Sequence, residues 1–350
     1  MLGRIGIVVC LMHFVIGNGN SLTFEQIQAH NLKALGGSIK EGYSQFCDSD
    51  IDQGILSFHG GGDPQDCSVE LISHSTNVTL PLRDIHKVFK RDLDFAKKTI
   101  IFINGFFSTE RNLIQNIRNI AKCSNLHDVL ILNFARSLQM LYNTAMHNIP
   151  VFAYAVLRIL DTLVQNKLSK HQIVLVGHSQ GAHIASAAAK LFHQQHAWRL
   201  PLVIALDPAI PCDPKRQYVN REVAEQVLVI HTDHKQFGLK DAMGTIDYYP
   251  NGVDKQQPGC KDPTCSHEKA VQIFAESVCN PGSFMAVRCK DWDAFQKNMC
   301  YRGGVVPIGL RIPPGTKGKY YSMTKREAPF GLGFSGISPN KVKSWWNHDI

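Results

Sequence analysis

Five short runs of apolar residues, rich in Val, Ile and Leu, recur along the middle of the chain. They cover residues 98–103, 129–132, 173–176, 202–206 and 227–230, and each is followed at once by Asn, Gly, Asp or His. Near-continuous apolar runs of this length are typical of strands that are buried on both faces of a parallel sheet. The sequence therefore predicts a strand at each of these five places.

Between the predicted strands, three segments carry apolar side chains at spacings of three and four residues, which indicates helices at 113–121, 151–165 and 181–193. Strands that alternate with helices favour one α/β domain, with a mostly parallel central sheet and helices on both faces. We place this domain at residues 67–335. The weakly patterned residues 20–66 are predicted to be an N-terminal extension that packs on the domain. Residues 336–350 are predicted to be a C-terminal tail, and the last 60 or so residues to be loops with edge strands.

Composition excludes several classes of protein. The 350 residues are 44% hydrophobic and 19% charged, which is ordinary for a globular domain and excludes a mostly disordered, fibrous or coiled-coil chain. The 37 Lys and Arg residues outnumber the 29 Asp and Glu residues, but the excess is spread along the chain. No nucleic-acid partner is therefore expected.

The first 19 residues have the pattern of a secretory signal peptide. Arg4 is followed by the apolar residues 5–16 and then by the small residues Gly17 and Gly19. A membrane anchor is the alternative, but this run is too short to cross a bilayer comfortably. We therefore expect a secreted, extracellular chain. Asn77, in Asn-Val-Thr, is then a candidate glycosylation site.

Nine cysteines remain after cleavage behind Gly19, and they lie at positions 47, 67, 123, 212, 260, 265, 279, 289 and 300. Because no CxxC pair and no His at finger spacing accompany them, disulfides are favoured over zinc. An odd number implies that at least one thiol is free or pairs between chains.

Residues 177–183 read Gly-His-Ser-Gln-Gly-Ala-His and connect a predicted strand to a predicted helix. In this context G-x-S-x-G is typical of a sharp turn that presents the hydroxyl of Ser179 at the carboxyl end of the sheet. The amide groups at the start of the helix would face the same point, where an oxyanion would form. Ser179 is thus a candidate nucleophile. The alternative is an ordinary glycine-rich turn with a capping serine.

A nucleophilic serine needs a base that takes its proton and an acid that orients the base. Asp207 ends the next predicted strand and would lie on the same rim of the sheet as Ser179. Since Asp-Pro is also a common turn, a purely structural role for Asp207 remains open at this point.

Three histidines downstream of Asp207 are candidates for the base, namely His231, His234 and His267. His231 directly follows a predicted strand and could be a buried structural residue. His267 lies in a loop pinned by Cys260 and Cys265, at the start of a helix-like stretch over 268–278. A loop residue held on the rim is better placed to reach the serine, so we favour His267.

Five motifs occur in a fixed order between residues 177 and 267. They read G-H-S-x-G-A-H, L-D-P-A, V-I-H-T-D, D-Y-Y-P-N-G and P-G-C…C-S-H. Together they closely resemble the pancreatic lipase family, especially its insect members and the phospholipase A1 branch known from wasp venoms. The resemblance covers roughly residues 67–334 and implies an α/β-hydrolase fold. It implies Ser179 as nucleophile, Asp207 as orienting acid and His267 as general base, with an oxyanion hole formed by the backbone amides of Phe106 and Gln180.

The resemblance also bears on the substrate and the partners. In the family a lid lies between the cysteines that match Cys260 and Cys265, and here only residues 261–264 separate them. This loop and the loop at 234–246 resemble the short versions of the phospholipase A1 branch, whose open site accepts bulky polar head groups. Asn220 and Val223 stand where the digestive members hold calcium with carboxylates, so no metal or other cofactor is expected. We expect no counterpart of the family's colipase-binding sandwich, and no colipase-type partner.

Three residues depart from the family pattern. Asn104 stands where a histidine is usual, Asn133 begins a pair that replaces Asp-Trp, and Gln180 replaces a leucine. None of these changes removes a member of the triad. We expect a secreted serine esterase that cleaves the sn-1 ester of a phospholipid at a membrane or lipid-aggregate surface. The alternatives are a triacylglycerol or galactolipid lipase, and a non-catalytic lipid-binding or yolk-type storage protein. Cys289 and Cys300 are expected to form a structural disulfide.

Overall fold

The computed structural model describes most of the chain between residues 68 and 339. The described ranges are 68–73, 77–81, 84–89, 93–105, 111–123, 126–134, 142–233, 236–300 and 304–339. The predicted signal peptide, the N-terminal extension and most of the predicted tail lie outside them.

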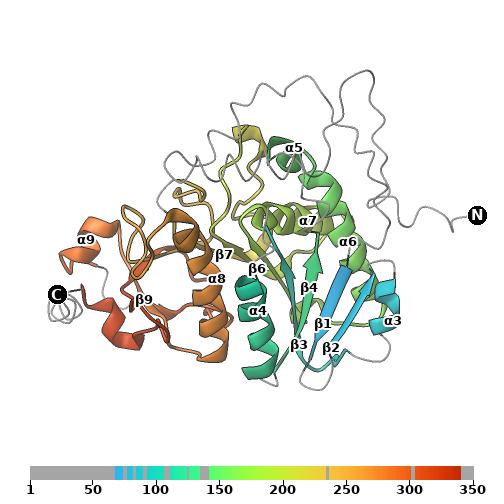
Figure 1. Cartoon of the computed structure of the whole chain (residues 1–350). Helices are drawn as coiled ribbons and strands as arrows, with labels where there is room; N and C mark the ends of the chain where they lie inside the picture. Colours follow the sequence, from blue (N-terminus) through green and yellow to red (C-terminus); the bar gives the residue numbers. More distant parts are fainter. Residues whose placement is uncertain are drawn as a thin grey trace, which may run out of the picture.

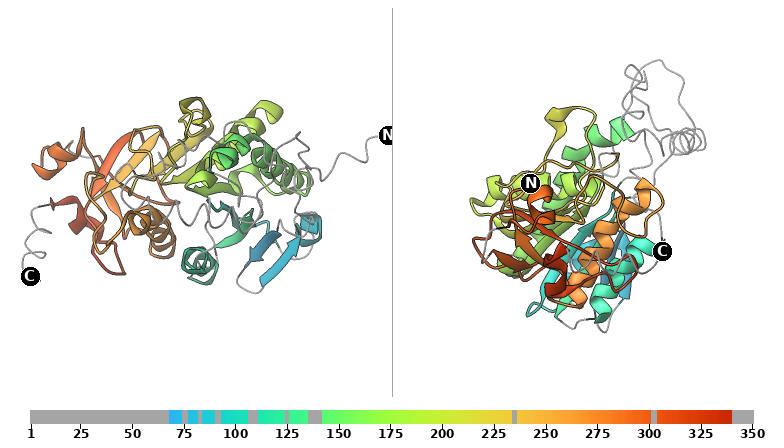
Figure 2. Two further views of the ribbon diagram at one scale, coloured as in Figure 1. Left: turned by 45° about the horizontal axis from the view of Figure 1, so that its top comes forward. Right: turned by 90° about the vertical axis from the view of Figure 1, so that its left-hand side faces the viewer.

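One sheet runs through the described part of the chain (Figure 1). Its strands are β1 (Ser68–Ile72), β2 (Asn77–Pro81), β3 (Lys98–Ile103), β4 (His127–Asn133), β5 (Ile173–His178), β6 (Leu200–Leu206), β7 (Ala224–Ile230), β8 (Ile246–Pro250), β9 (Met285–Arg288), β10 (Val305–Pro307) and β11 (Gly318–Ser322). They are ordered β10-β9-β11-β8-β7-β6-β5-β3-β4-β1-β2. The stretch from β11 to β4 is parallel, whereas β9 and β10 at one end and β1 and β2 at the other pair antiparallel. These antiparallel ends lie at opposite ends of the molecule (Figure 2).

Helices cover both faces of the sheet. The longer ones are α4 (Arg111–Cys123), α6 (Ile149–Gln165), α7 (Gln180–His196) and α8 (Pro263–Cys279), and the short ones are α3 (Ile85–Phe89), α5 (Tyr142–His147), α9 (Trp292–Gln296), η3 (Lys170–Gln172), η4 (Pro214–Arg216) and η5 (Gly333–Ile337). Helices α4 and α8 lie side by side on one face, and α6 and α7 lie together on the other (Figure 1). No helix in the described residues combines the length and the apolar character that a bilayer crossing needs.

Successive side chains of the central strands enter two separate cores, which explains the unbroken apolar runs. In β3, Ile101 and Ile103 pack into the core under α6 and α7, whereas Ile100 and Phe102 pack into the core under α4 and α8. Strands β5, β6 and β7 divide their side chains in the same way. The mostly parallel sheet with helices on both faces, predicted from the sequence, is confirmed.

Several elements escaped the sequence prediction. Strands β1, β2 and β8 were not predicted, and β11 differs from the expected edge strand because it lies inside the sheet, parallel to β8 and beside β9. Strands β8 and β11 and helix α9 contribute to a third, smaller core around Tyr249, Phe295 and Tyr321. The aromatic side chains of this core replace the Val and Ile runs that mark the central strands.

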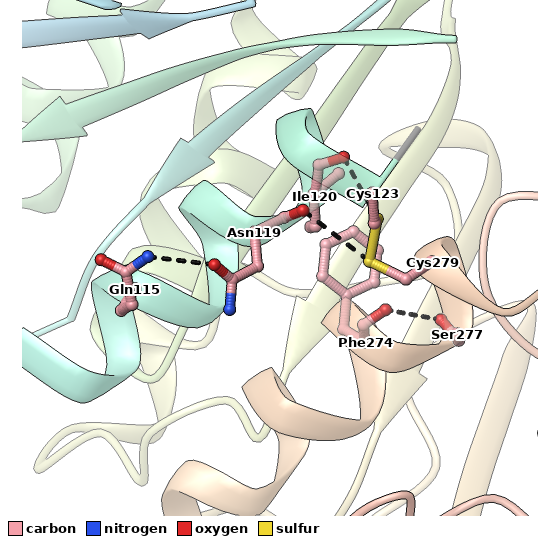
Figure 3. The surroundings of a disulfide bond; sticks show 7 residues. All are labelled: Gln115, Asn119, Ile120, Cys123, Phe274, Ser277 and Cys279. Atoms are coloured by element: carbon pink, nitrogen blue, oxygen red, sulfur yellow. Dashed lines mark hydrogen bonds between the residues drawn. A yellow bond between two sulfur atoms is a disulfide. The ribbon is translucent and has the colours of Figure 1, made fainter. Parts of the chain in front are cut away.

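Disulfides tie distant parts of the chain together. Cys123 at the end of α4 bonds to Cys279 at the end of α8, 156 residues later (Figure 3). The pairs Cys260–Cys265 and Cys289–Cys300 also form. Cys212 is disulfide-bonded as well, so none of the seven cysteines in the described ranges is a free thiol. The expectation of an unpaired or intermolecular cysteine concerns the whole chain and stays a prediction.

Candidate active site

Ser179 occupies a strained turn between β5 and α7. Its φ and ψ angles are 57° and −123°, a region that residues with a side chain rarely adopt. The Ser179 N–H donates to the carbonyl of Leu206 at 2.9 Å, which fixes the turn to the end of the neighbouring strand. A Cβ at Gly177 would collide with the backbone of Gly181, so the glycine spacing follows from a close backbone contact.

The segment after β3 packs directly against this turn. A Cβ on Gly105 would lie 2.7 Å from the Cβ of Ser179 and 2.8 Å from the carbonyl oxygen of His178. Phe106, expected to donate to an oxyanion, lies outside the described residues. Gln180 is the first residue of α7, where a backbone N–H has no partner earlier in the helix. The amide of Gln180 therefore lies next to the serine, and its role in an oxyanion hole stays a prediction.

Asp207 follows β6 and is completely buried. Its Oδ1 accepts hydrogen bonds from the backbone amides of Thr232 at 2.8 Å and Asp233 at 3.1 Å. Gly238 packs so closely on the Asp207 carboxyl group that a Cβ there would overlap it. The carboxylate of Asp233 holds the loop that contains Gly238 in place, because its Oδ2 accepts hydrogen bonds from the backbone amides of residues 236–238.

His267 meets Asp207 at the carboxyl edge of the sheet. Its Nδ1 lies 2.6 Å from Oδ2 of Asp207, and the His267 side chain is 8% exposed. Burial by itself lowers the pKa of His267, but the hydrogen bond and the charge of Asp207 outweigh it and raise that pKa above its ordinary value. His267 is therefore bonded to Asp207, and its role as the general base stays a prediction.

The local setting of His267 differs from the sequence prediction. His267 lies inside α8, in its second turn, and not in a loop before a helix. The helix begins earlier because Asp262 caps it, accepting a hydrogen bond from the N–H of Cys265 at 2.8 Å, and because Pro263 suits a first helical position. The short segment between Cys260 and Cys265 thus forms a helix start.

His178 is a buried neighbour of His267 that the sequence did not single out. Its Nε2 lies 3.1 Å from the carbonyl oxygen of His267, and the two rings are 4.6 Å apart. Burial, followed by the nearby His267, holds the pKa of His178 well below its ordinary value, so the ring stays neutral and donates this hydrogen bond. His178 thereby connects the serine turn to the helix that carries His267.

His231, the rejected candidate, has partners of its own. Its Nε2 lies 3.0 Å from Oδ1 of Asp247, its Nδ1 lies 2.7 Å from the carbonyl oxygen of Leu239, and its ring stacks on Tyr249. The side chain is fully buried. His231 therefore holds the 236–246 loop in place through its contact with Leu239.

Two of the unusual residues leave buried polar atoms without hydrogen bonds beside the serine. Gln180 is fully buried, and neither atom of its side-chain amide has a partner. The Oδ1 of Asn104, at the end of β3, is in the same state. Unsatisfied buried polar atoms are uncommon in folded proteins, and side chains such as Thr99 and Ser186 also carry them here.

The positions compared with the family's calcium site carry no carboxylate. Asn220 accepts the amide of Glu222 at 2.9 Å, and Val223 is buried. Within the described ranges, no three His, Cys, Asp or Glu side chains gather as metal ligands.

The fold and this arrangement define a class. A mostly parallel sheet with a G-x-S-x-G turn after one strand, an Asp after the next and a later His bonded to that Asp is an α/β-hydrolase. Residues 73–330 match the model of the Lipase family, and the chain belongs to that family.

Curated relatives are 26–30% identical to this chain over the regions that match. Phospholipase A1 2 of Polistes dominula is 30% identical over 66% of this chain and 78% of its own length. Inactive pancreatic lipase-related protein 1 of Mus musculus is 28% identical over 64% of this chain and 52% of its own, so the chain matches about half the length of such relatives. Among solved structures, Est1E from Butyrivibrio proteoclasticus matches 48% of this chain and 75% of its own with 15% identity and a TM-score of 0.30.

Proposed function

We propose that the protein is a secreted serine esterase that hydrolyses an acyl ester of a lipid, with phospholipase A1 activity on the sn-1 ester. The observation that carries this proposal is the buried contact of 2.6 Å between His267 and Asp207, at the sheet edge where Ser179 sits in its strained turn. A histidine fixed by a buried carboxylate beside such a serine is the arrangement that activates a hydroxyl.

In this proposal the hydroxyl of Ser179 attacks the ester carbonyl while Nε2 of His267 takes its proton. Asp207 holds the Nδ1–H tautomer and stabilises the imidazolium that forms. The backbone amides of Gln180 and Phe106 donate to the oxyanion of the tetrahedral intermediate. His267 then gives its proton to the leaving alcohol. Water, deprotonated by the same histidine, hydrolyses the acyl-enzyme.

The short loops support a phospholipid over a triglyceride. The residues between Cys260 and Cys265 form the capped start of α8. The loop at 236–246 packs against Asp207 and His267, and the Phe237 ring lies 5.6 Å from the His267 ring. Neither segment is then available as a long lid. Relatives named phospholipase A1 in Polistes dominula are similar to this chain over most of their length.

An active-site phosphonate tests the catalytic proposal. A fluorophosphonate should label the wild-type protein and fail to label Ser179→Ala, while Ser335→Ala, an exposed serine, keeps full labelling. A second candidate, a non-catalytic lipid-binding protein, is favoured by the similarity to a relative named inactive. A folded wild-type protein that stays unlabelled would contradict the catalytic proposal and favour that candidate.

Substrate choice needs a separate assay. Vesicles of a phospholipid with different acyl chains at sn-1 and sn-2 would show which fatty acid is released, with triacylglycerol emulsions and galactolipid run in parallel. We expect release from sn-1 at a rate at least tenfold above that from triacylglycerol. Equal or faster triacylglycerol turnover would replace phospholipase A1 by lipase in the proposal.

Secretion and glycosylation are testable together. The disulfides of the described residues fit an oxidising compartment. Expressed in insect cells, the protein should reach the medium without residues 1–19 and carry a glycan that is lost in Asn77→Gln. Retention of the first 19 residues in the product would contradict the signal peptide.

A further inference from the structure

A cavity lies at the amino ends of strands β3 and β4, at the opposite end of the strands from the serine. It has a volume of about 450 Å³, within the range of small-molecule sites. Lys98 and His127, which line it, are paired first residues of the parallel strands β3 and β4, whereas Ser179 follows the last residue of β5. The length of β3 therefore separates the two sites by roughly 20 Å. The Cys123–Cys279 disulfide forms part of the wall.

Two cationic side chains and one histidine line this cavity. They are Lys98, Arg311 and His127, and the lining residues that the structure describes include no Asp or Glu. Burial and the charges of Lys98 and Arg311 lower the pKa of His127 to about 4. Nδ1 of His127 is buried and has no hydrogen-bond partner. An anion placed among these three groups would satisfy all of them at once.

The rest of the lining is largely apolar. Val278, Pro281, Pro307, Ile308 and Leu310 contribute to it, and Leu126 beside them is 59% exposed. An apolar wall beside a cationic cluster suits a molecule that carries one anionic group on a hydrocarbon chain.

We propose that this cavity binds a single-chain anionic amphiphile, with its carboxylate or phosphate among Lys98, His127 and Arg311 and its chain along the apolar wall. The site is separate from the serine and does not depend on the proposed activity. A fatty acid and a lysophosphatidic acid share the required chemistry, and the choice between carboxylate and phosphate is left to the experiment.

Calorimetric titration of the Ser179→Ala protein tests the proposal without turnover. The probes are dodecanoate, dodecyl phosphate, neutral monolauroylglycerol and inorganic phosphate, each below its aggregation concentration. We expect one site for at least one of the two anionic amphiphiles. Its affinity should fall by about tenfold or more in Lys98→Ala and again in Lys98→Ala/Arg311→Ala, because each change removes a charged contact. Lys319→Ala, an exposed lysine away from the cavity, should bind as the parent does.

A nuclear magnetic resonance titration of His127 provides a local readout. Bound anion should raise the pKa of His127 from its low value, because a nearby negative charge favours the imidazolium. The proposal is overturned if neither anionic amphiphile binds, if the double variant binds as tightly as the parent, or if His127 does not respond. Equal affinity for the neutral ester would overturn the role of the cations, and equal affinity for inorganic phosphate would overturn the role of the apolar wall. Lys98 and Arg311 could instead only stabilise the carboxyl ends of α4 and α8. In that case the Lys98→Ala/Arg311→Ala variant loses stability, the parent binds no probe, and the proposal is overturned.

Discussion

The Cys123–Cys279 disulfide should contribute more to stability than the other two disulfides of known partners. It closes a loop of 156 residues between α4 and α8, against 11 residues for Cys289–Cys300 and 5 for Cys260–Cys265. In the chain-entropy description, a crosslink stabilises the folded state by restricting the unfolded chain, and the effect grows with the logarithm of the loop length. These loops correspond to about 5, about 3 and about 2 kcal/mol at 25 °C.

Three double Cys→Ser variants, each lacking one bond, measure this order. Guanidinium unfolding followed by circular dichroism, without reductant, gives the free energy of unfolding for each. The variant lacking Cys123–Cys279 should lose most and should also show the largest rise in m value, because its unfolded chain exposes more surface. Cys123 is exposed and Cys279 is half-buried, so the serines themselves should cost little.

The reasoning would be refuted by a loss of the same size in all three variants. It would also be refuted if removal of Cys260–Cys265 had the largest effect. In either case the bonds would act mainly through the folded state, for instance through the cap of α8.

Three other outcomes follow from the site. Gly238→Ala pushes a methyl group into the Asp207 carboxyl group and should lower kcat/KM by about 100-fold in an esterase assay. A cooperative unfolding transition should remain, which shows that the variant is folded. Unchanged turnover would show that Asp207 tolerates displacement. The His267 base must be neutral and its pKa is raised, so kcat/KM should rise with pH through a pKa above 6.5. Asp207→Asn removes the carboxylate that raises this pKa, so the acid limb of the pH profile should move to lower pH and the maximum should fall by about 10⁴-fold. An acid limb that stays in place would show that it does not report the titration of His267. Gln180→Leu removes an unsatisfied side-chain amide and should raise the free energy of unfolding by about 1–2 kcal/mol. The control Gln195→Leu loses a hydrogen bond of 2.9 Å to Asp161 and should lower the free energy of unfolding. Destabilisation by both changes would mean that the Gln180 side chain has a hydrogen-bond partner.

The central strands were predictable because their side chains are buried on both faces. Residues 173–176 and 202–206 show this as unbroken apolar runs, and the structure extends each run by a few residues at most. Strand β2 escaped prediction because it lies at an edge, with Asn77 and Thr79 exposed. Strand β8 is buried but consists of Ile-Asp-Tyr-Tyr-Pro, since Asp247 binds His231 there. A polar partner inside the core removed the pattern on which the prediction depends.

The site was more predictable in its residues than in its contacts. The G-x-S-x-G spacing and the strand-end position of Asp207 follow from local backbone geometry, which a sequence records. The start of α8 could have been read from Asp262-Pro263, a capping residue followed by a first-turn proline. The hydrogen bond from His178 to the His267 carbonyl joins residues 89 positions apart, and the Cys123–Cys279 bond joins residues 156 apart. Pairings of this kind depend on how the helices pack, and a single sequence does not record that.

The two outer strands of the described sheet have a consequence for self-association. Backbone groups on an outer strand can recruit a strand from another molecule, which is how ordered aggregates grow. Strand β10 is short and ends at Pro307, and β2 ends at Pro81, so each loses an amide donor at its last residue. The sequon asparagine is the exposed first residue of β2, and a sugar attached there would stand beside an outer strand of the described sheet. A sugar at this position would shield β2 from such recruitment, whereas β10 depends on its short length and on Pro307.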